Sequence, residues 1–201
     1  MAAYKGIQRF EGIVVNPTAA DADYFWVSAA MKATAYTLLF STMPDGLARS
    51  ITAKRTTVDV ADTGFALTVS GTDNAGNAIS EQLALTTSAT TYETTQAFKT
   101  FTVAISPAWV IGGTTADNLI IGYGTRVSVK AGTGVLHGWY VNTAVATGAV
   151  TLTDGMPSPT TLLVIPVGAA AGSYQAGLNI GFATQCSATF AGTGNITFIY
   201  R

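Results

Sequence analysis

The segment from Phe65 to Ile105 constrains the fold more than any other part of the chain, because its hydrophobic residues alternate with small polar ones. In its first part, FALTVSG, the side chains of Phe65, Leu67 and Val69 fall on one face of an extended strand. The turn GTDNAGNA follows, rich in the Gly, Asn and Asp residues that tolerate the left-handed backbone of hairpins. ISEQLALTT then returns, and AFKTFTVAISP alternates once more before it stops at Pro107. The pattern predicts short antiparallel strands joined by tight turns.

One acidic residue disturbs this alternation. Ile79, Leu83 and Leu85 are the expected inward-facing residues of ISEQLALTT, and strict alternation places Glu81 on the same face. We therefore expect a β-bulge or an edge position at Glu81.

The remaining segments also have the composition of strands. YFWVSAAM, AYTLLFST, SITAKRTTVDV and NLIIGYG are strand candidates, although SAAMKATA could instead hold a helical turn. MPDGLAR has its proline, aspartate and glycine in the order of a tight turn. From Arg126 onward, VSVKAGTGVLHGWYVNT predicts two strands around a Gly132–Gly134 turn, and GAVTLTDG, TLLVIPV and GSYQAGLNIGF predict further strands. QCSATFAGTGNITFIYR predicts a closing hairpin with its turn over residues 191–195.

Short strands with turn signals at spacings of about 8–12 residues indicate a sandwich or a jelly roll. We predict an all-β protein in which two β-sandwich or jelly-roll-like modules follow an extended N-terminal arm. The arm is residues 1–22, which contain one short strand and the breaker Asn16–Pro17; a loosely ordered terminus is the alternative. The first module is residues 23–125 and the second is residues 126–201, with the boundary placed at the Gly122–Gly124 pair.

The chain carries little charge. Charged residues make up 10% of it, whereas about 25% is usual for a soluble domain. Hydrophobic residues reach 48%, much of this alanine, so the surface should be neutral and hydroxyl-rich and should associate readily. With a net charge of −1, and Lys54–Arg55 as the only adjacent basic pair, the sequence has no electrostatic footprint for DNA or RNA. We expect an oligomer that binds no nucleic acid.

No stretch approaches the roughly 18 apolar residues of a membrane span. The start, MAAYKGIQRFEG, lacks the apolar region of a signal peptide. We expect no contact with a membrane, no Sec-type export, and synthesis in a cytoplasm.

Few side chains suit nucleophilic catalysis. A Ser–His–acid set would need His137, the only histidine, as its base, and no G-x-S-x-G stands near it. His137 lies in the strand-like GVLHGWYV, where a packing role is the usual one. Cys186, the only cysteine, excludes an intrachain disulfide and lies in the strand-like FATQCSATF, which predicts a buried, inert thiol.

Acids and aromatic residues offer weaker alternatives. Most acids lie in turns, and pairing Glu81 with Glu93 for glycoside hydrolysis has no support in their spacing. The Asp73–Asn77 turn starts like a calcium loop but lacks the spaced acids and flanking helices of an EF-hand, so a plain hairpin turn is expected. We predict no catalytic, cofactor-binding or metal-binding residues, and no enzyme. Exposed aromatic residues could bind sugars, or they could be buried in strands; the candidates are Trp26, Trp109, Trp139 and Tyr140.

Two parts of the sequence resemble virion proteins of tailed bacteriophages, of the small decoration, cement or head-accessory kind. VSGTDNAGNAISEQLALTTSATTYETTQAFKTFTVAI (residues 69–105), with NLIIGYG (118–124), is similar to a β-module with a "TGTD-x-x-G-x-x-I-x-E" start, a "T-x-x-A-F-K-T" middle and a "GYG" close. GTGVLHGWYVNTAVATGAVTLTDG, with the terminal GNITFIYR, resembles a jelly-roll-like module of the same kind of protein.

The resemblance implies a β-protein of the virion, made in a host bacterial cytoplasm and bound to the capsid surface. It implies a homotrimer whose partner is the major capsid protein and which holds neighbouring coat subunits together. We expect the arm (residues 1–22) and an exposed β-edge to dock on the shell. The alternatives are a receptor- or glycan-binding module of a head or tail fibre, or another tail or connector component.

Overall fold

The computed structural model describes residues 10–30, 41–63, 66–105, 110, 117–155 and 159–201. The chain divides into two compact units, and the division falls within strand β8. We call Thr18–Ser128 the N-terminal unit. Val129–Arg201, together with the residues up to Pro17, form the C-terminal unit.

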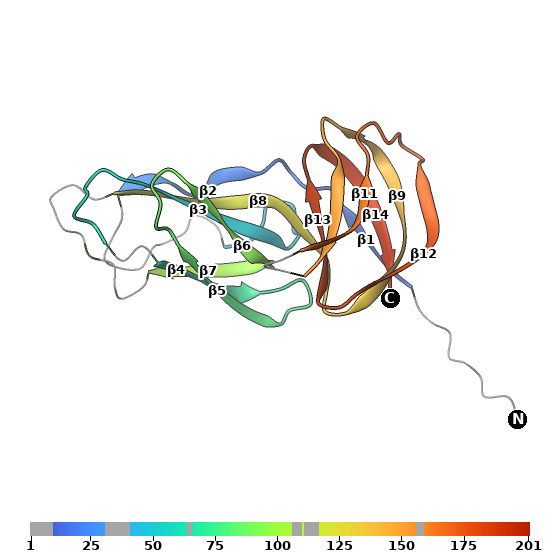
Figure 1. Cartoon of the computed structure of the whole chain (residues 1–201), viewed down its shortest axis with the longest axis horizontal. Helices are drawn as coiled ribbons and strands as arrows, with labels where there is room; N and C mark the ends of the chain where they lie inside the picture. Colours follow the sequence, from blue (N-terminus) through green and yellow to red (C-terminus); the bar gives the residue numbers. More distant parts are fainter. Residues whose placement is uncertain (1–9, 31–40, 64–65, 106–109, 111–116, 156–158) are drawn as a thin grey trace, which may run out of the picture. The chain divides into compact units, whose positions relative to one another are not determined.

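Every regular element in the described residues is a β-strand, which confirms the predicted all-β class (Figure 1). The N-terminal unit holds β2 (Asp21–Ala30), β3 (Arg49–Thr56), β4 (Ala66–Thr72), β5 (Ala78–Ala84), β6 (Thr91–Phe98), β7 (Thr100–Ile105) and most of β8 (Asn118–Ala131). The C-terminal unit holds β1 (Glu11–Val15), β9 (Gly134–Ala146), β10 (Val150–Asp154), β11 (Thr160–Ile165), β12 (Tyr174–Phe182), β13 (Gln185–Phe190) and β14 (Thr193–Tyr200). Across the described residues, no helix is long and apolar enough to cross a membrane.

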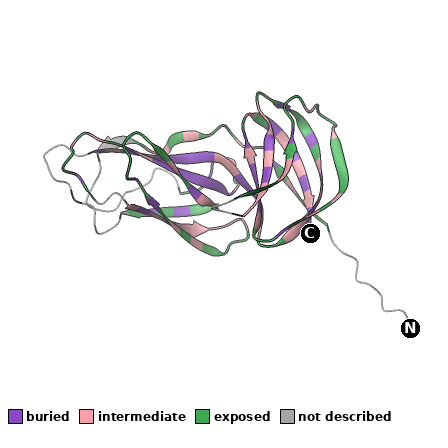
Figure 2. Cartoon of the chain, viewed as in Figure 1, coloured by how far each residue is buried: buried purple, intermediate pink, exposed green. Residues whose placement is uncertain are grey.

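The N-terminal unit is a sandwich of two antiparallel sheets. One sheet has the order β6-β3-β8, with β2 also paired to β8, and the other has the order β5-β4-β7. Hydrophobic side chains from both sheets meet in one buried cluster between them. Figure 2 colours the buried residues of these strands purple. The largest members of the cluster include Phe25, Ile51, Leu67, Phe98, Phe101, Leu119 and Ile121.

The alternation predicted for residues 65–105 is present in this unit. Leu67 and Val69 of β4 are buried together with Phe101 of β7, whereas the intervening Thr68 is partly exposed. Phe65 lies outside the described residues. The alternation of hydrophobic and polar residues therefore predicted correctly which face of these strands is buried.

The turn between β4 and β5 is the plain hairpin turn expected from the sequence. The side chain of Asp73 accepts hydrogen bonds from the backbone N–H groups of Ala75 at 2.8 Å and Asn77 at 2.9 Å. Gly76 adopts a left-handed backbone with φ of 86°. The aspartate therefore shapes the loop by bonding its own backbone.

Glu81 lies on an edge strand as predicted, because β5 is the last strand of its sheet. The alternative expectation of a bulge is wrong, since β4 and β5 pair in one continuous register. The inward-facing carboxylate is instead satisfied by the opposite sheet. It accepts the backbone N–H groups of Thr95 at 2.8 Å and Gln96 at 2.9 Å, and the Thr95 hydroxyl at 3.0 Å.

The C-terminal unit also contains two groups of antiparallel strands. One sheet has the order β1-β14-β9-β12, and the other group has the order β11-β10-β13. Strands of both contribute buried residues, among them Val15, Leu136, Val141, Leu152, Ile165, Phe190, Ile196 and Phe198.

The closing hairpin predicted for the last residues is wrong. β13 and β14 are consecutive, but β13 pairs with β10 whereas β14 pairs with β1 and β9. The chain changes sheets at Ala191 and Gly192, and a Cβ on Gly192 would collide with the backbone of Ala146. A turn-forming sequence between two strands thus marks a crossing between sheets here.

The described part of the predicted arm contains the expected short strand. This is β1, which pairs with β14 of the same chain from Glu11↔Tyr200 to Val15↔Ile196. Docking of the arm on a neighbouring subunit stays a prediction. Residues 31–40, which include most of the predicted AYTLLFST strand and the end of SAAMKATA, lie outside the described residues.

Candidate binding surfaces

His137 has the surroundings of a packing residue. It lies in β9, and its ring meets the ring of Phe10 edge to face, with centroids 4.7 Å apart. Its Nε2 atom is buried and makes no hydrogen bond within the described residues. The described surroundings thus supply no nucleophile for it to activate. The absence of enzymatic activity stays a prediction.

Cys186 is a buried thiol in β13, as the sequence predicts. Burial raises its pKa to about 12, and the negative charge of Asp154 acts in the same direction. A nucleophilic cysteine needs its thiolate form near neutral pH, so this thiol is inert.

The acids considered as catalytic or metal-binding groups are held by other parts of the protein. Glu81 is bonded to β6, as described above, and Glu93 forms an ion pair with Arg126 at 3.5 Å. Both carboxylate oxygens of Asp73 are bonded within its own turn. Within the described ranges, no three His, Cys, Asp or Glu side chains gather as a metal site would require.

A buried ion pair organises one end of the N-terminal unit. Arg55 donates to Asp117 at 2.6 Å and to the carbonyl of Leu85 at 3.0 Å. The other oxygen of Asp117 accepts the N–H groups of Val58 at 2.7 Å and Asp59 at 2.9 Å. Burial opposes ionisation of Asp117, but these N–H groups and Arg55 outweigh it and lower its pKa. In the sequence, Arg55 stood out only as a member of the adjacent basic pair Lys54–Arg55.

Arg49 is a second buried cation. Only 1% of its surface is exposed, its guanidinium donates to Asp45 at 3.0 Å and to the Thr18 carbonyl at 3.0 Å, and it stacks on Tyr123. The protein has only 10 basic and 11 acidic residues. Each ion pair that is buried therefore removes a noticeable share of the charge from the surface. The exterior is therefore poorer in charge than composition alone indicates.

Asp154 clamps the turn between β12 and β13. Its carboxylate accepts the N–H groups of Ala183 at 2.6 Å, Thr184 at 3.0 Å and Gln185 at 3.2 Å. Partial burial works against ionisation, but these hydrogen bonds outweigh it and lower the pKa of Asp154 to about 2.

This shift predicts an acid-dependent loss of stability. The pKa of Asp154 is 3.8 in the unfolded chain and about 2 in the folded one, so its stabilisation is complete above pH 3.8 and lost as the pH falls toward 2. We expect Asp154→Asn to remove about 1–2 kcal/mol of unfolding free energy at pH 7, after allowance for solvent screening. Urea unfolding at pH 7 and pH 2.5 measures this. An equal loss at both pH values would contradict the assignment.

The outward side of the β1-β14-β9-β12 sheet carries a row of four residues in register. Val14 pairs with Thr197, Thr197 with Tyr140, and Tyr140 with Tyr174. Tyr140 is 43% exposed and Tyr174 is 72% exposed. We call this side of the sheet the tyrosine face.

Of the three aromatic candidates that the structure describes, only Tyr140 is an exposed residue. Trp26 packs against the core of the N-terminal unit, and Trp139 is half-buried with its indole nitrogen covered. Trp109 lies outside the described residues. Tyr174 was missed, because its pairing with Tyr140 depends on strands 34 residues apart in sequence.

A small amide cluster lies next to Tyr140. The side-chain amide of Asn142 donates to Asn195 Oδ1 at 3.0 Å and to Thr197 Oγ1 at 2.9 Å. Asn142 is an extra residue at a register shift, because Val141 pairs with Ile196 and Thr143 pairs with Asn195. Such bulges re-aim side chains beside binding sites.

In the part of the chain that the structure describes, β11 is an uncharged edge strand of the C-terminal unit. It is the last strand of the order β11-β10-β13, and its sequence TTLLVI holds no charged residue. Val164 is 50% exposed at this edge. Uncharged edges of this kind pair readily with strands of other chains.

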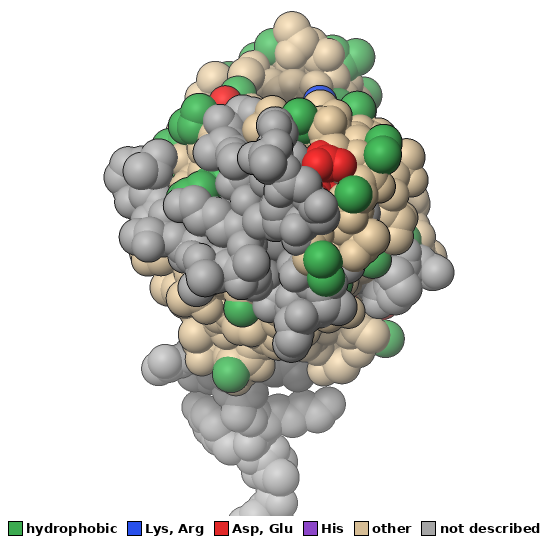
Figure 3. Space-filling model, turned by 90° about the vertical axis from the view of Figure 1, so that its left-hand side faces the viewer, with side chains coloured by type: hydrophobic (Ala, Val, Ile, Leu, Met, Phe, Trp, Pro, Cys, Tyr) green, Lys and Arg blue, Asp and Glu red, His purple; other side chains and the backbone are tan. Residues whose placement is uncertain are grey.

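One end of the N-terminal unit also exposes valine side chains. Val58 and Val60 lie in the loop after β3 and are 50% and 93% exposed, and the exposed Val110 bridges to Thr63 of the same loop. In Figure 3, hydrophobic side chains are scattered over the coloured part of this face, and few acidic or basic side chains are visible there.

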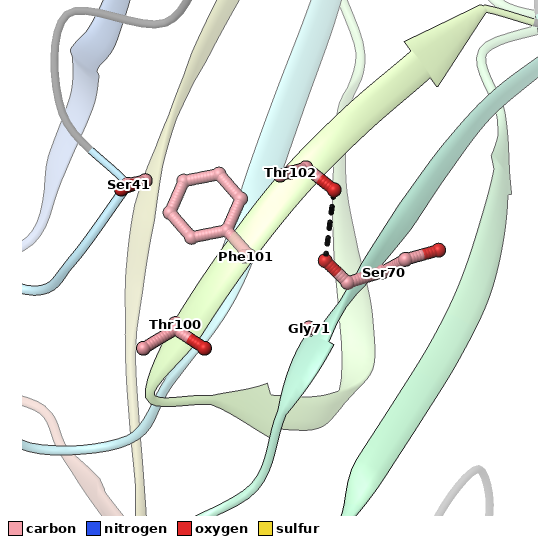
Figure 4. A pocket seen from close by; sticks show the side chains of 6 residues that line it. All are labelled: Ser41, Ser70, Gly71, Thr100, Phe101 and Thr102. Atoms are coloured by element: carbon pink, nitrogen blue, oxygen red, sulfur yellow. Dashed lines mark hydrogen bonds between the residues drawn. The ribbon is translucent and has the colours of Figure 1, made fainter.

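The N-terminal unit has a shallow pocket of about 300 Å³ over β4 and β7 (Figure 4). It is lined by Ser41, Ser70, Gly71, Thr100, Phe101 and Thr102. The Thr102 hydroxyl donates to the Ser70 carbonyl at 3.3 Å. No lining residue is charged or ionisable near neutral pH, so these six residues include no general acid or base.

Comparisons with known proteins identify no family. No protein-family model matches the chain, and the search of curated proteins found no match. Among solved structures, the chain is similar to the STIV MCP, the STIV major capsid protein, with 9% sequence identity and a TM-score of 0.23 over 96% of each chain. A likeness at this TM-score does not establish a common fold.

Proposed function

We propose that the protein is a structural component of a virion that binds the surface of an assembled capsid and bridges neighbouring coat subunits. The observation that carries this proposal is the nearly uncharged exterior of the C-terminal unit. The described residues of the C-terminal unit contain four charged side chains, Glu11, Lys130, Asp154 and Arg201. Such a surface repels other subunits only weakly, which suits a protein that functions by binding to them.

The sequence resemblance to phage decoration proteins supports the same role and adds a homotrimer and the major capsid protein as partner. Apolar contact contributes about 25 cal/mol per Å² before entropic costs, and stable, specific interfaces usually bury about 1,600 Å². The exposed β11 edge and the exposed valines of the N-terminal unit are the surfaces we assign to these contacts. A tail or connector role would use similar surfaces on a different partner.

Sedimentation with assembled shells tests the proposal. We expect the purified chain to have a solution mass near three times 20.7 kDa by light scattering. It should sediment with shells assembled from the coat protein of the same genome, but not with free coat subunits. A chain that stays in the supernatant with intact shells would refute a decoration role.

A β11 variant tests which surface is used. Val164→Lys places a charge on the edge strand and should lower shell binding or the trimer fraction at least fivefold. Val164→Thr keeps a neutral β-branched residue and should behave like the original chain. Equal behaviour of the two variants would remove β11 from the contact.

A further inference from the structure

We propose that the tyrosine face of the C-terminal unit binds a neutral saccharide, with Tyr140 and Tyr174 as its stacking platform. This goes beyond a role in holding the shell together, because it assigns a separate ligand to a separate surface. The two tyrosines are direct cross-strand partners on β9 and β12, so their Cβ atoms lie about 5 Å apart. Both rings project on the same side of the sheet and are exposed to solvent.

Sugar rings present apolar C–H faces and a rim of hydroxyl groups. A site for them therefore needs exposed aromatic surface beside a few polar groups that both donate and accept hydrogen bonds. The amide cluster supplies such groups next to Tyr140. The two bonds donated by Asn142 leave its carbonyl oxygen as an acceptor and leave the Asn195 amide and the Thr197 hydroxyl as donors.

The lack of charged residues at this level of the tyrosine face indicates which class of ligand it can bind. The residues that pair across it at this level, Val14, Thr197, Tyr140 and Tyr174, are uncharged, as are Asn142 and Asn195. An anionic ligand such as a phosphate or a sulfated glycan would find no cation on these residues. A neutral saccharide is the polar ligand that this surface matches.

Binding to neutral oligosaccharides tests the proposal. A glycan array is followed by calorimetry with the best neutral hexasaccharide and with an anionic hyaluronan hexasaccharide. We expect saturable binding of a neutral glycan, at least tenfold weaker in Tyr140→Ala and in Tyr174→Ala. Tyr140→Phe and Tyr174→Phe keep the ring and should stay within threefold, as should Val60→Ala in the other unit.

Three outcomes would overturn the inference. These are no binding to any neutral glycan, equal binding by the double alanine variant, and a preference for the anionic probe. Tyr174 is 72% exposed on an edge strand, so Tyr174→Ala should fold even if Tyr140→Ala does not. Shell sedimentation of the tyrosine variants should be unchanged, which separates this inference from the proposed structural role.

Discussion

Replacing Asp117 with alanine should lower the unfolding free energy by about 3–5 kcal/mol, as is typical when one partner of a buried ion pair is removed. Arg55 is only 5% exposed and donates to Asp117 at 2.6 Å, so Asp117→Ala removes the carboxylate that this buried cation contacts. The same change removes the acceptor for the N–H groups of Val58 and Asp59. Urea unfolding monitored by tryptophan fluorescence measures the loss.

Two further variants make this prediction specific. Glu93→Ala also removes an acid from an ion pair, but Glu93 is exposed and lies 3.5 Å from Arg126, so it should cost no more than about 1 kcal/mol. The double variant Asp117→Ala with Arg55→Met removes both charges and should recover part of the loss. A single Asp117→Ala variant as stable as Glu93→Ala would show that the buried pair contributes little.

Gly122→Ala should also be strongly destabilising, by about 3 kcal/mol, the upper end of the usual range for overpacking. Gly122 lies in β8, in the GYG sequence, where β2 crosses close to the backbone. A Cβ at this position would collide with the carbonyl group of Asp21 and with Ala22. Because both contacts are backbone, relief requires β2 itself to move away from β8.

Gly181→Ala is the matched control, because nothing lies within 4 Å of its Cβ position. It should be neutral or stabilising by up to about 1 kcal/mol, since alanine restricts the unfolded chain. Hydrogen exchange of the β2 amides should be faster in Gly122→Ala and unchanged in Gly181→Ala. Equal stability of the two variants would show that β2 does not depend on close approach at Gly122.

Alternation in the sequence determined which residues of a strand face the core. Leu67, Val69 and Phe101 are buried as their spacing predicts, and the Asp73 turn closes the hairpin that its composition predicts. These features are local, because a strand's side chains alternate between its two faces whatever strand it pairs with. The low proportion of charged residues could likewise be read from the sequence alone.

Tertiary structure decided which strands pair and what each polar side chain meets. The sequence predicted a hairpin between β13 and β14, yet these strands pair in different sheets. Glu81 finds its donors on β6 of the opposite sheet, and Tyr140 finds Tyr174 on β12. Alternation sets the face of a strand but carries no information about its neighbour, which is chosen by packing among residues distant in sequence. The fold class could therefore be predicted from the sequence, whereas the tyrosine face and the buried ion pairs required the folded chain.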